Sequence, residues 1–162
     1  MTRPGRAKRA YAAFATTRVA RFVSRHVSWR LDPILLRLTG GRLASTLVFP
    51  AAVLETRGAR SGARRRNAVI TVADGDSTVI VASNAGDPRH PAWFHNLRAD
   101  PSVLLGGRPV RATVVTDEAE RERIWALADD VFPAFARYRR DAAAVGRTIP
   151  LVRLDPREPS PG

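Results

Sequence analysis

Arginine and glycine alternate through residues 57–66, where the side-chain types suit the binding of an anion. The residues of this segment that carry the pattern are Arg57, Gly58, Ala59, Arg60, Ser61, Gly62, Arg64, Arg65 and Arg66. Glycine lets backbone N–H groups come close to an anion, and guanidinium groups neutralise it through paired hydrogen bonds. The pattern therefore favours a phosphate cradle, although it is not a P-loop because no Gly-Lys-Ser/Thr follows. It leaves open two alternatives, a solvated basic hairpin and a grip on single-stranded RNA.

Two histidines, His90 and His95, flank the segment 91–94. A spacing of five residues places them on different faces of a helix, and no nearby acid or cysteine completes a set of metal ligands. We therefore expect no metal site there. The sequence has no cysteine and shows no Ser-His-Asp arrangement or paired carboxylates of the kind that hydrolases use. An enzyme without such groups leaves the chemistry to a cofactor.

Three aromatic residues, Phe132, Phe135 and Tyr138, follow one another at intervals of three. On a helix this spacing places them along one side. The spacing alone favours a role in the core over a role in ligand binding.

Cationic charge is the strongest feature of the composition, with 27 lysine and arginine residues against 15 acids and a net charge of +12. Such a surface suits nucleic acid, anionic lipid or a polyanionic small molecule, and charge alone does not choose among them. The 162 residues suffice for one domain and a terminal extension. No segment has the pattern of a transmembrane helix or of a secretory signal, so we expect a cytoplasmic protein.

Short strands joined by hairpins dominate the pattern from residue 47 onward. We predict strands at 51–56, 67–73, 78–82, 102–105, 110–115 and 149–154. Asp74-Gly75-Asp76 is typical of a tight hairpin turn, because Asp-Gly tolerates positive φ. We predict a short helix at 91–98 and a longer one from residue 117 to about Arg140, which Pro133 kinks or restarts. The fold class is α+β, a small mixed barrel with a late helix between its last two strands.

The first 31 residues carry eight basic side chains and no acid. A helical pattern places Tyr11, Phe14, Phe22 and Trp29 near one side. This segment is either a basic amphipathic helix on an anionic surface, such as the inner face of the membrane, or a helix packed on its own domain. We divide the chain into a basic helical extension at 1–45, a barrel domain at 46–155 and a loose tail at 156–162.

Four blocks of the sequence, read together, resemble the deazaflavin (F420)-dependent nitroreductase family. They are LETRGARSGARRRN at 54–67, VIVASNAGDPRHPAWFHNLRADP at 79–101, DEAERERIW at 117–125 and GRTIPLV at 146–152. Their order and spacing agree with the family over about two-thirds of the chain. The resemblance implies a split β-barrel related to the FMN-binding barrels, with an N-terminal helix and a long late helix.

The resemblance also implies a site for coenzyme F420. Arg60, Ser61 and Arg65 are expected to hold the phosphate and acidic tail. The full set of expected cofactor residues is Ala59, Arg60, Ser61, Arg65, Arg66, Asn67, Ala68, Val69, Ile70, Val81, Ala82, Ser83, Asn84, Trp93 and Asn96. Phe132, Phe135 and Tyr138 match the positions that cover the substrate, which reverses the interpretation drawn from their spacing alone.

The implied activity is hydride transfer from reduced F420 to a quinone, a nitro compound or a similar electron-poor acceptor. The protein's task is then to hold the acceptor against the reduced ring in a dry pocket. A proton for the reduced acceptor can come from Ser83, Tyr138 or water, and the sequence does not choose among them. The alternative is a non-catalytic barrel that binds F420 or an apolar ligand, and nucleic-acid binding ranks a distant third.

Overall fold

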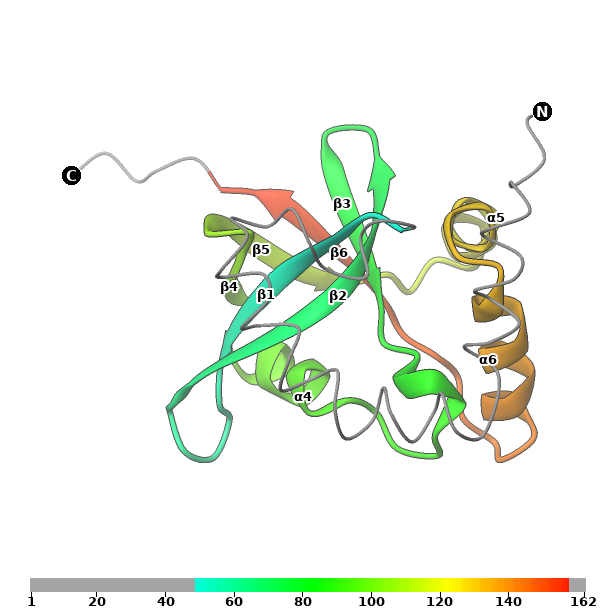
Figure 1. Ribbon diagram of the computed structural model, residues 1–162, viewed down its shortest axis with the longest axis horizontal. Coiled ribbons are helices and arrows are strands. Elements are labelled where there is room, and N and C mark those ends of the chain that lie inside the picture. Colours follow the sequence, from blue (N-terminus) through cyan, green and yellow to red (C-terminus); the bar gives the residue numbers. More distant parts are fainter. Residues whose placement is uncertain (1–48, 158–162) are drawn as a thin grey trace.

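The structure, a computed structural model, describes residues 49–157 and shows six antiparallel strands closed into a barrel, with three α-helices (Figure 1). Around the barrel the strands follow the order β1-β2-β3-β6-β5-β4, and β4 pairs with β1 to close it. The strands are β1 (Ala51–Arg57), β2 (Arg64–Asp74), β3 (Ser77–Val81), β4 (Ser102–Leu105), β5 (Arg108–Val114) and β6 (Leu151–Pro156). The helices are η3 (Asn84–Gly86, a 3-10 turn), α4 (Ala92–Ala99), α5 (Glu118–Val131) and α6 (Ala134–Ala143). The α+β class and the barrel are confirmed.

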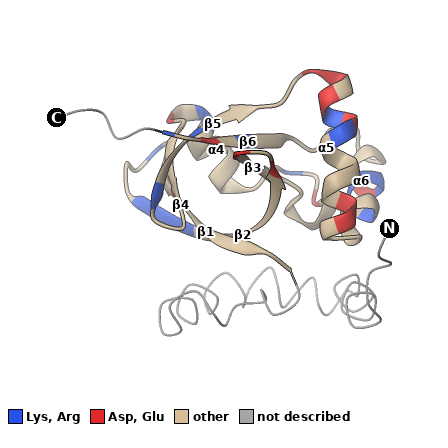
Figure 2. Ribbon diagram, turned by 90° about the horizontal axis from the view of Figure 1, so that it is seen from above, with Lys and Arg blue, Asp and Glu red and all other residues tan. Residues whose placement is uncertain are grey.

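The β1–β2 hairpin gathers the arginines of residues 57–66 at one end of the barrel. Its register runs from Ala51 opposite Ile70 to Arg57 opposite Arg64, so the turn at 58–63 lies beyond the last pair. This turn projects from the long β1–β2 ribbon in Figure 1. Figure 2 shows basic residues at this end of the hairpin, whereas α5 and α6 carry both signs of charge.

Buried side chains form two clusters that the helices help to build. One cluster combines strand residues such as Leu54 and Ile80 with Trp93, Phe94 and Leu97 of α4. The second joins strand residues to α5 and α6 through Val72, Val79, Val81, Ile124, Trp125, Ala128, Phe132, Phe135, Tyr138 and others. The barrel therefore presents apolar strand residues to α4 on one side and to the α5–α6 pair on the other.

The late helical segment is divided in two. The carboxylate of Asp117 caps α5 by accepting a hydrogen bond of 2.8 Å from the backbone N–H of Glu120. The helix ends at Val131, and α6 begins after Pro133. Proline cannot continue the hydrogen-bond ladder of a helix, so the break falls where the sequence predicts it.

An ion-pair network ties α5 to the barrel. Arg123 of α5 donates two hydrogen bonds, of 2.6 and 2.9 Å, to Asp74 at the end of β2, and Arg153 of β6 donates one of 3.1 Å. Arg153 also pairs with Glu120. The hydrogen bonds from Arg123 lower the pKa of Asp74 most, and the one from Arg153 lowers it further. Burial has the opposite effect, and the pKa falls from 3.8 to about 2.

Within residues 49–157, no helix is long and apolar enough to cross a membrane. The helices predicted before residue 49 lie outside the described residues.

Candidate functional site

The turn between β1 and β2 is compact and carries its arginines outward. The N–H of Gly58 donates to Ala63 O and that of Gly62 to Gly58 O, both at 2.8 Å. A Cβ at Gly58 would lie only 2.7 Å from Ser61 Oγ, so a side chain there would displace Ser61. The arginine residues at 57, 60, 64, 65 and 66 are all exposed.

The positive charge of this turn is mostly unbalanced. Arg66 forms an ion pair of 3.0 Å with Glu55, whereas Arg57, Arg60, Arg64 and Arg65 have no carboxylate partner among the described residues. Guanidinium groups bind phosphate and carboxylate in a bidentate manner. The turn can therefore accept a ligand that carries several negative charges.

Asn96 fastens the turn to α4. Its Oδ1 accepts a hydrogen bond of 3.1 Å from the N–H of Ala59, and its Nδ2 donates one of 3.0 Å to Thr56 Oγ1. Asn96 and Thr56 are both buried. A buried amide with both ends bonded fixes the turn in one orientation.

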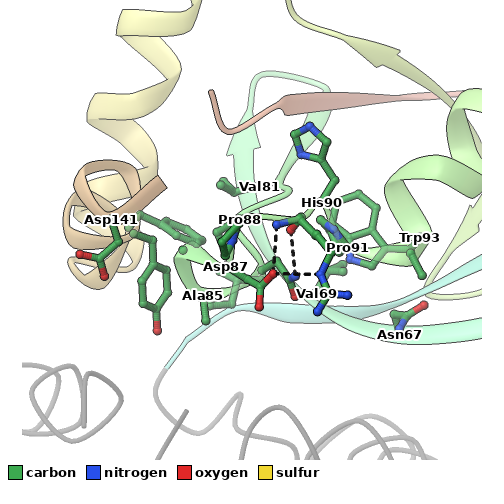
Figure 3. Close-up of a pocket in the computed structure, with 18 of the residues that line it drawn as sticks. Asn67, Val69, Val81, Ala85, Asp87, Pro88, His90, Pro91, Trp93 and Asp141 are labelled. Atoms are coloured by element: carbon green, nitrogen blue, oxygen red, sulfur yellow. Dashed lines mark hydrogen bonds and ion pairs between the residues drawn. The ribbon is translucent and has the colours of Figure 1, made fainter. Parts of the chain in front are cut away.

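A cavity of about 1210 Å³ extends from β2 to α6. It is formed by β2, the end of β3, the loop from residue 83 to 91, the first residues of α4, and α6 with the residue before Pro133. In Figure 3, Asp141 of α6 and Asn67 of β2 lie at opposite ends of the row of lining residues, with Ala85 and Asp87 between them. Ligand pockets for one small molecule are roughly 300–1,000 Å³, so this cavity exceeds the usual size for one small ligand.

The loop at the centre of the cavity has an unusual backbone. Asn84, Ala85 and Gly86 have φ values of 48°, 53° and 78°. Left-handed conformations at residues other than glycine cost about 1–3 kcal/mol each and persist where surrounding contacts enforce them. Gly86 has a further reason to be glycine, since a Cβ there would lie 2.9 Å from Asp141 Cβ. The loop thus meets α6 at a point where no side chain fits.

A buried arginine, Arg147, holds this loop. Its Nη1 donates to Ser83 O at 2.9 Å and to Asp87 O at 2.6 Å, and its Nη2 donates to Ala82 O at 2.5 Å. Burial lowers the pKa of this guanidinium, against a smaller opposing effect of Asp87, yet arginine remains a cation at neutral pH.

The same arginine sets the state of His90. Arg147 Nε donates a hydrogen bond of 3.1 Å to His90 Nδ1, so a neutral His90 carries its proton on Nε2. Burial lowers the pKa of His90, and positive charge on Arg147, His95 and Arg98 lowers it further. His90 is therefore neutral at pH 7.

The aromatic residues of the late helices serve the core and the cavity together. Phe132, Phe135 and Tyr138 are 5%, 3% and 7% exposed, and all three line the cavity. The ring centres of Phe132 and Phe135 lie 5.0 Å apart at a steep angle. Their burial fits the core role that the spacing favours, and their position gives the cavity an apolar wall.

The expected cofactor and substrate residues fall into two groups. Those that line the cavity are Asn67, Ala68, Val69, Ile70, Val81, Ser83, Asn84, Trp93, Phe132, Phe135 and Tyr138. Those that do not are Ala59, Arg60, Ser61, Arg65 and Arg66 at the turn, together with the buried Ala82 and Asn96. The two groups meet at Asn67, which follows Arg66 on β2.

Sequence reasoning missed several residues of the cavity. Besides part of α6, these are Ala85, Gly86, Asp87, Pro88, Arg89, His90 and Pro91 of the loop, with Ala92 and His95 of α4. It gave His90 no role and passed over Arg147, although Arg147 lies in the GRTIPLV block. An arginine just before an apolar strand was the available signal.

Comparisons with known proteins agree on one family. The sequence profile of the F420H(2)-dependent quinone reductases matches residues 28–156. The F420H(2)-dependent quinone reductase Rv1261c of Mycobacterium tuberculosis is 32% identical over 146 residues, which cover 84% of this chain and 97% of the relative.

Two solved structures have the same fold. An F420-H2-dependent reductase, FDR-A, is 32% identical with a TM-score of 0.57, over 65% of this chain and 94% of that chain. A domain-swapped dimer is 31% identical with a TM-score of 0.59, over 78% of this chain and 94% of that chain.

Proposed function

Because the chain belongs to the F420H(2)-dependent quinone reductase family, it is an oxidoreductase that uses coenzyme F420, and we propose that hydride transfer to a quinone takes place in the cavity between β2 and α6. One observation carries this placement. A single cavity joins the strand that continues from the arginine turn to an apolar wall of aromatic rings. Nitro compounds are a second class of acceptor for the same wall.

The arginine turn fits the anionic end of the cofactor. F420 carries a phosphate and a chain of glutamates, and four exposed arginines of the turn lack a carboxylate partner among residues 49–157. Arg60 and Arg65, with Ser61 between them, would bind this end through charge-assisted hydrogen bonds. FMN lacks the acidic chain, so it should bind less tightly.

The adjoining part of the cavity fits a flat ring system. Ala68, Val69, Ile70 and Val81 offer small or apolar side chains, and Trp93 lies at the same wall. When bound, reduced F420 supplies a hydride from C5 of its deazaflavin ring. The protein's part is to orient an acceptor against the ring and to exclude water.

The aromatic wall fits the acceptor. Phe132, Phe135 and Tyr138 line the cavity, the last two from α6. Ser83 and Tyr138 carry the hydroxyl groups among the described lining residues, so each can donate a proton to the reduced acceptor.

The basic residues 1–31 lie outside the described residues, and their role follows from the sequence alone. We propose that this segment associates from the cytoplasmic side with anionic membrane, where lipid-soluble quinones are found. Eight basic side chains provide the attraction.

Turnover with a soluble quinone tests the function. F420H2 and menadione are mixed with the full chain without oxygen, and the fluorescence of oxidised F420 is followed. We expect oxidation that depends on both protein and menadione. If the protein binds F420 but does not promote oxidation of F420H2, it is a carrier of the cofactor and not a reductase.

A further inference from the structure

We propose that Arg147 is a positioning residue, which holds residues 82–90 in the shape that forms one wall of the cavity. This inference rests on the proposed function, because it assigns a task within the cavity described above. Arg147 is not among the residues that line the cavity, and it acts through the loop.

We call Arg147 and the loop groups that it bonds the clamp. It is unusual because its buried cation is held mainly by backbone carbonyls. Arg147 is 8% exposed, and it donates hydrogen bonds to the carbonyls of Ala82, Ser83 and Asp87 and to the ring of His90. These partners span the whole loop from the end of β3 almost to the start of α4. Only a planar group with five N–H donors can reach them together, and a lysine ammonium cannot.

The loop needs such a clamp. Asn84 and Ala85 hold left-handed backbone conformations that their side chains disfavour, and both line the cavity. Other bonds close the loop locally, since Asn84 Nδ2 donates to Arg89 O at 2.9 Å. At the edge of the loop the N–H of Ala82 also donates to Pro150 O at 3.0 Å. Arg147 joins the residues beyond this edge to the segment before β6 through Ser83, Asp87 and His90, so loss of Arg147 would let the wall relax.

Protonation of His90 would loosen the clamp. The Arg147 Nε–H needs an acceptor, and a protonated imidazole has an N–H on both nitrogens. The charged groups around His90 are Arg147, the loop residues Asp87 and Arg89, which pair with each other, and His95 and Arg98 of α4. The ring of Phe94, also on α4, packs 5.1 Å from that of His90. The surroundings therefore favour neutral His90 and a closed clamp at neutral pH.

The first test measures the titration of His90 by NMR in the full chain. The variants are Arg147→Lys and Arg147→Met, with Arg121→Lys as matched control. Arg121 also donates to two backbone carbonyls, those of Val115 and Ile149, but it does not line the cavity or touch the loop. We expect the pKa of His90 to rise toward its ordinary value in Arg147→Met and to stay as in the wild type in Arg121→Lys. An unchanged His90 titration in Arg147→Met would overturn the clamp.

The second test measures turnover of F420H2 with menadione. Arg147→Lys keeps the charge but loses the planar guanidinium group that reaches several acceptors at once. The cavity wall should then shift, and kcat should fall on the order of a hundredfold, as expected for a misplacement of about 1 Å. F420 affinity should fall much less than kcat, because the arginine turn is intact. A wild-type kcat in Arg147→Lys, or global unfolding of this variant, would overturn the positioning role.

A third variant isolates the pH effect. His90→Asn places an oxygen close to the position of Nδ1, so Arg147 keeps an acceptor that does not titrate. In the wild type, protonation of His90 should lower kcat at acid pH. This decline should disappear in His90→Asn, and its persistence would contradict the His90 link. A wild-type protein that fails to oxidise F420H2 would refute the proposed function, while the NMR titration would still decide on the clamp.

Discussion

Like charges face each other across the β1–β2 hairpin at the point where its turn begins. Arg57 is the cross-strand partner of Arg64, and the next pair joins Thr56 to Arg65. Like charges placed opposite each other destabilise a hairpin, and here no carboxylate of the described chain relieves Arg57 or Arg64. A polyanionic ligand would relieve this repulsion. The repulsion between these arginines thus indicates a polyanionic ligand, in agreement with the F420 that the family uses.

Removal of two arginines from the turn should weaken F420 binding. In Arg60→Ala/Arg65→Ala, two charge-assisted contacts at about 1.5–3 kcal/mol each are lost, so affinity should fall about a hundredfold or more. The effect should grow at low salt, where charges are screened less. Fluorescence titration with F420 measures it. The control Arg108→Ala/Arg140→Ala removes the same charge from exposed sites outside the turn. Equal losses of F420 affinity in both double variants would show that net charge, and not the turn, governs binding.

Phe135 should act on the acceptor more than on the cofactor. Phe135→Ala removes a buried ring and would cost about 3–5 kcal/mol of stability, so Phe135→Leu is the better variant. We expect a higher KM for menadione with F420 affinity close to that of the wild type. Phe94→Leu is the control, because Phe94 is equally buried but does not line the cavity. The same KM change in both variants would assign Phe135 to the core alone.

At the scale of elements, patterns within a few residues predicted a turn and a helix break correctly, whereas contacts between distant residues were not predicted. Asp74-Gly75-Asp76 fixed the β2–β3 turn, and Pro133 placed the break between α5 and α6. These signals act within a few residues of the chain. Arg147 and His90 are 57 positions apart, and nothing local marks them as partners. The pattern of arginine and glycine indicated the turn, and the resemblance supplied the strand residues with Ser83 and Asn84. The rest of the loop that faces α6 needed the structure.

The network around Asp74 should make α5 sensitive to acid. The folded pKa of Asp74 is depressed from 3.8 to about 2, so its stabilising effect is complete above pH 3.8 and is lost as the pH falls toward 2. The contribution is on the order of 2 kcal/mol. Urea unfolding between pH 5 and about pH 2 should show a shallower decline for Asp74→Asn than for the wild type. Asp76→Asn, at an exposed neighbour, is the control. An identical decline of stability with falling pH in all three proteins would show that Asp74 does not cause the acid sensitivity.

At the scale of the whole molecule, the charge is divided unevenly. The arginine turn lies at one end of the barrel, and the α5–α6 pair with its mixed charges lies at the other (Figure 2). The cavity runs between these ends, from Asn67 to Asp141. A ligand with an anionic tail and an apolar reacting partner would be oriented by this division. Among residues 49–157, the cluster of arginines at one end of the barrel depends on strand register, which composition does not reveal.

The N-terminal segment should govern association with membranes. Each basic residue near an anionic surface contributes about 1 kcal/mol, and residues 1–31 carry eight of them. Sedimentation with anionic liposomes compares the full chain with a chain that starts at Leu31. We expect the full chain to bind and the shorter one to lose binding while it keeps activity on menadione. Equal partitioning of both would end this proposal.

Amide hydrogen exchange with each ligand in turn tests the central claim most directly. The account predicts that F420 alone protects residues 58–70 and 81–91, which hold the turn, the adjoining strand and the loop. Addition of menadione should then extend protection to residues 132–141, which carry the aromatic wall. Protection by F420 that leaves residues 58–70 unchanged, or protection by menadione that leaves 132–141 unchanged, would contradict it.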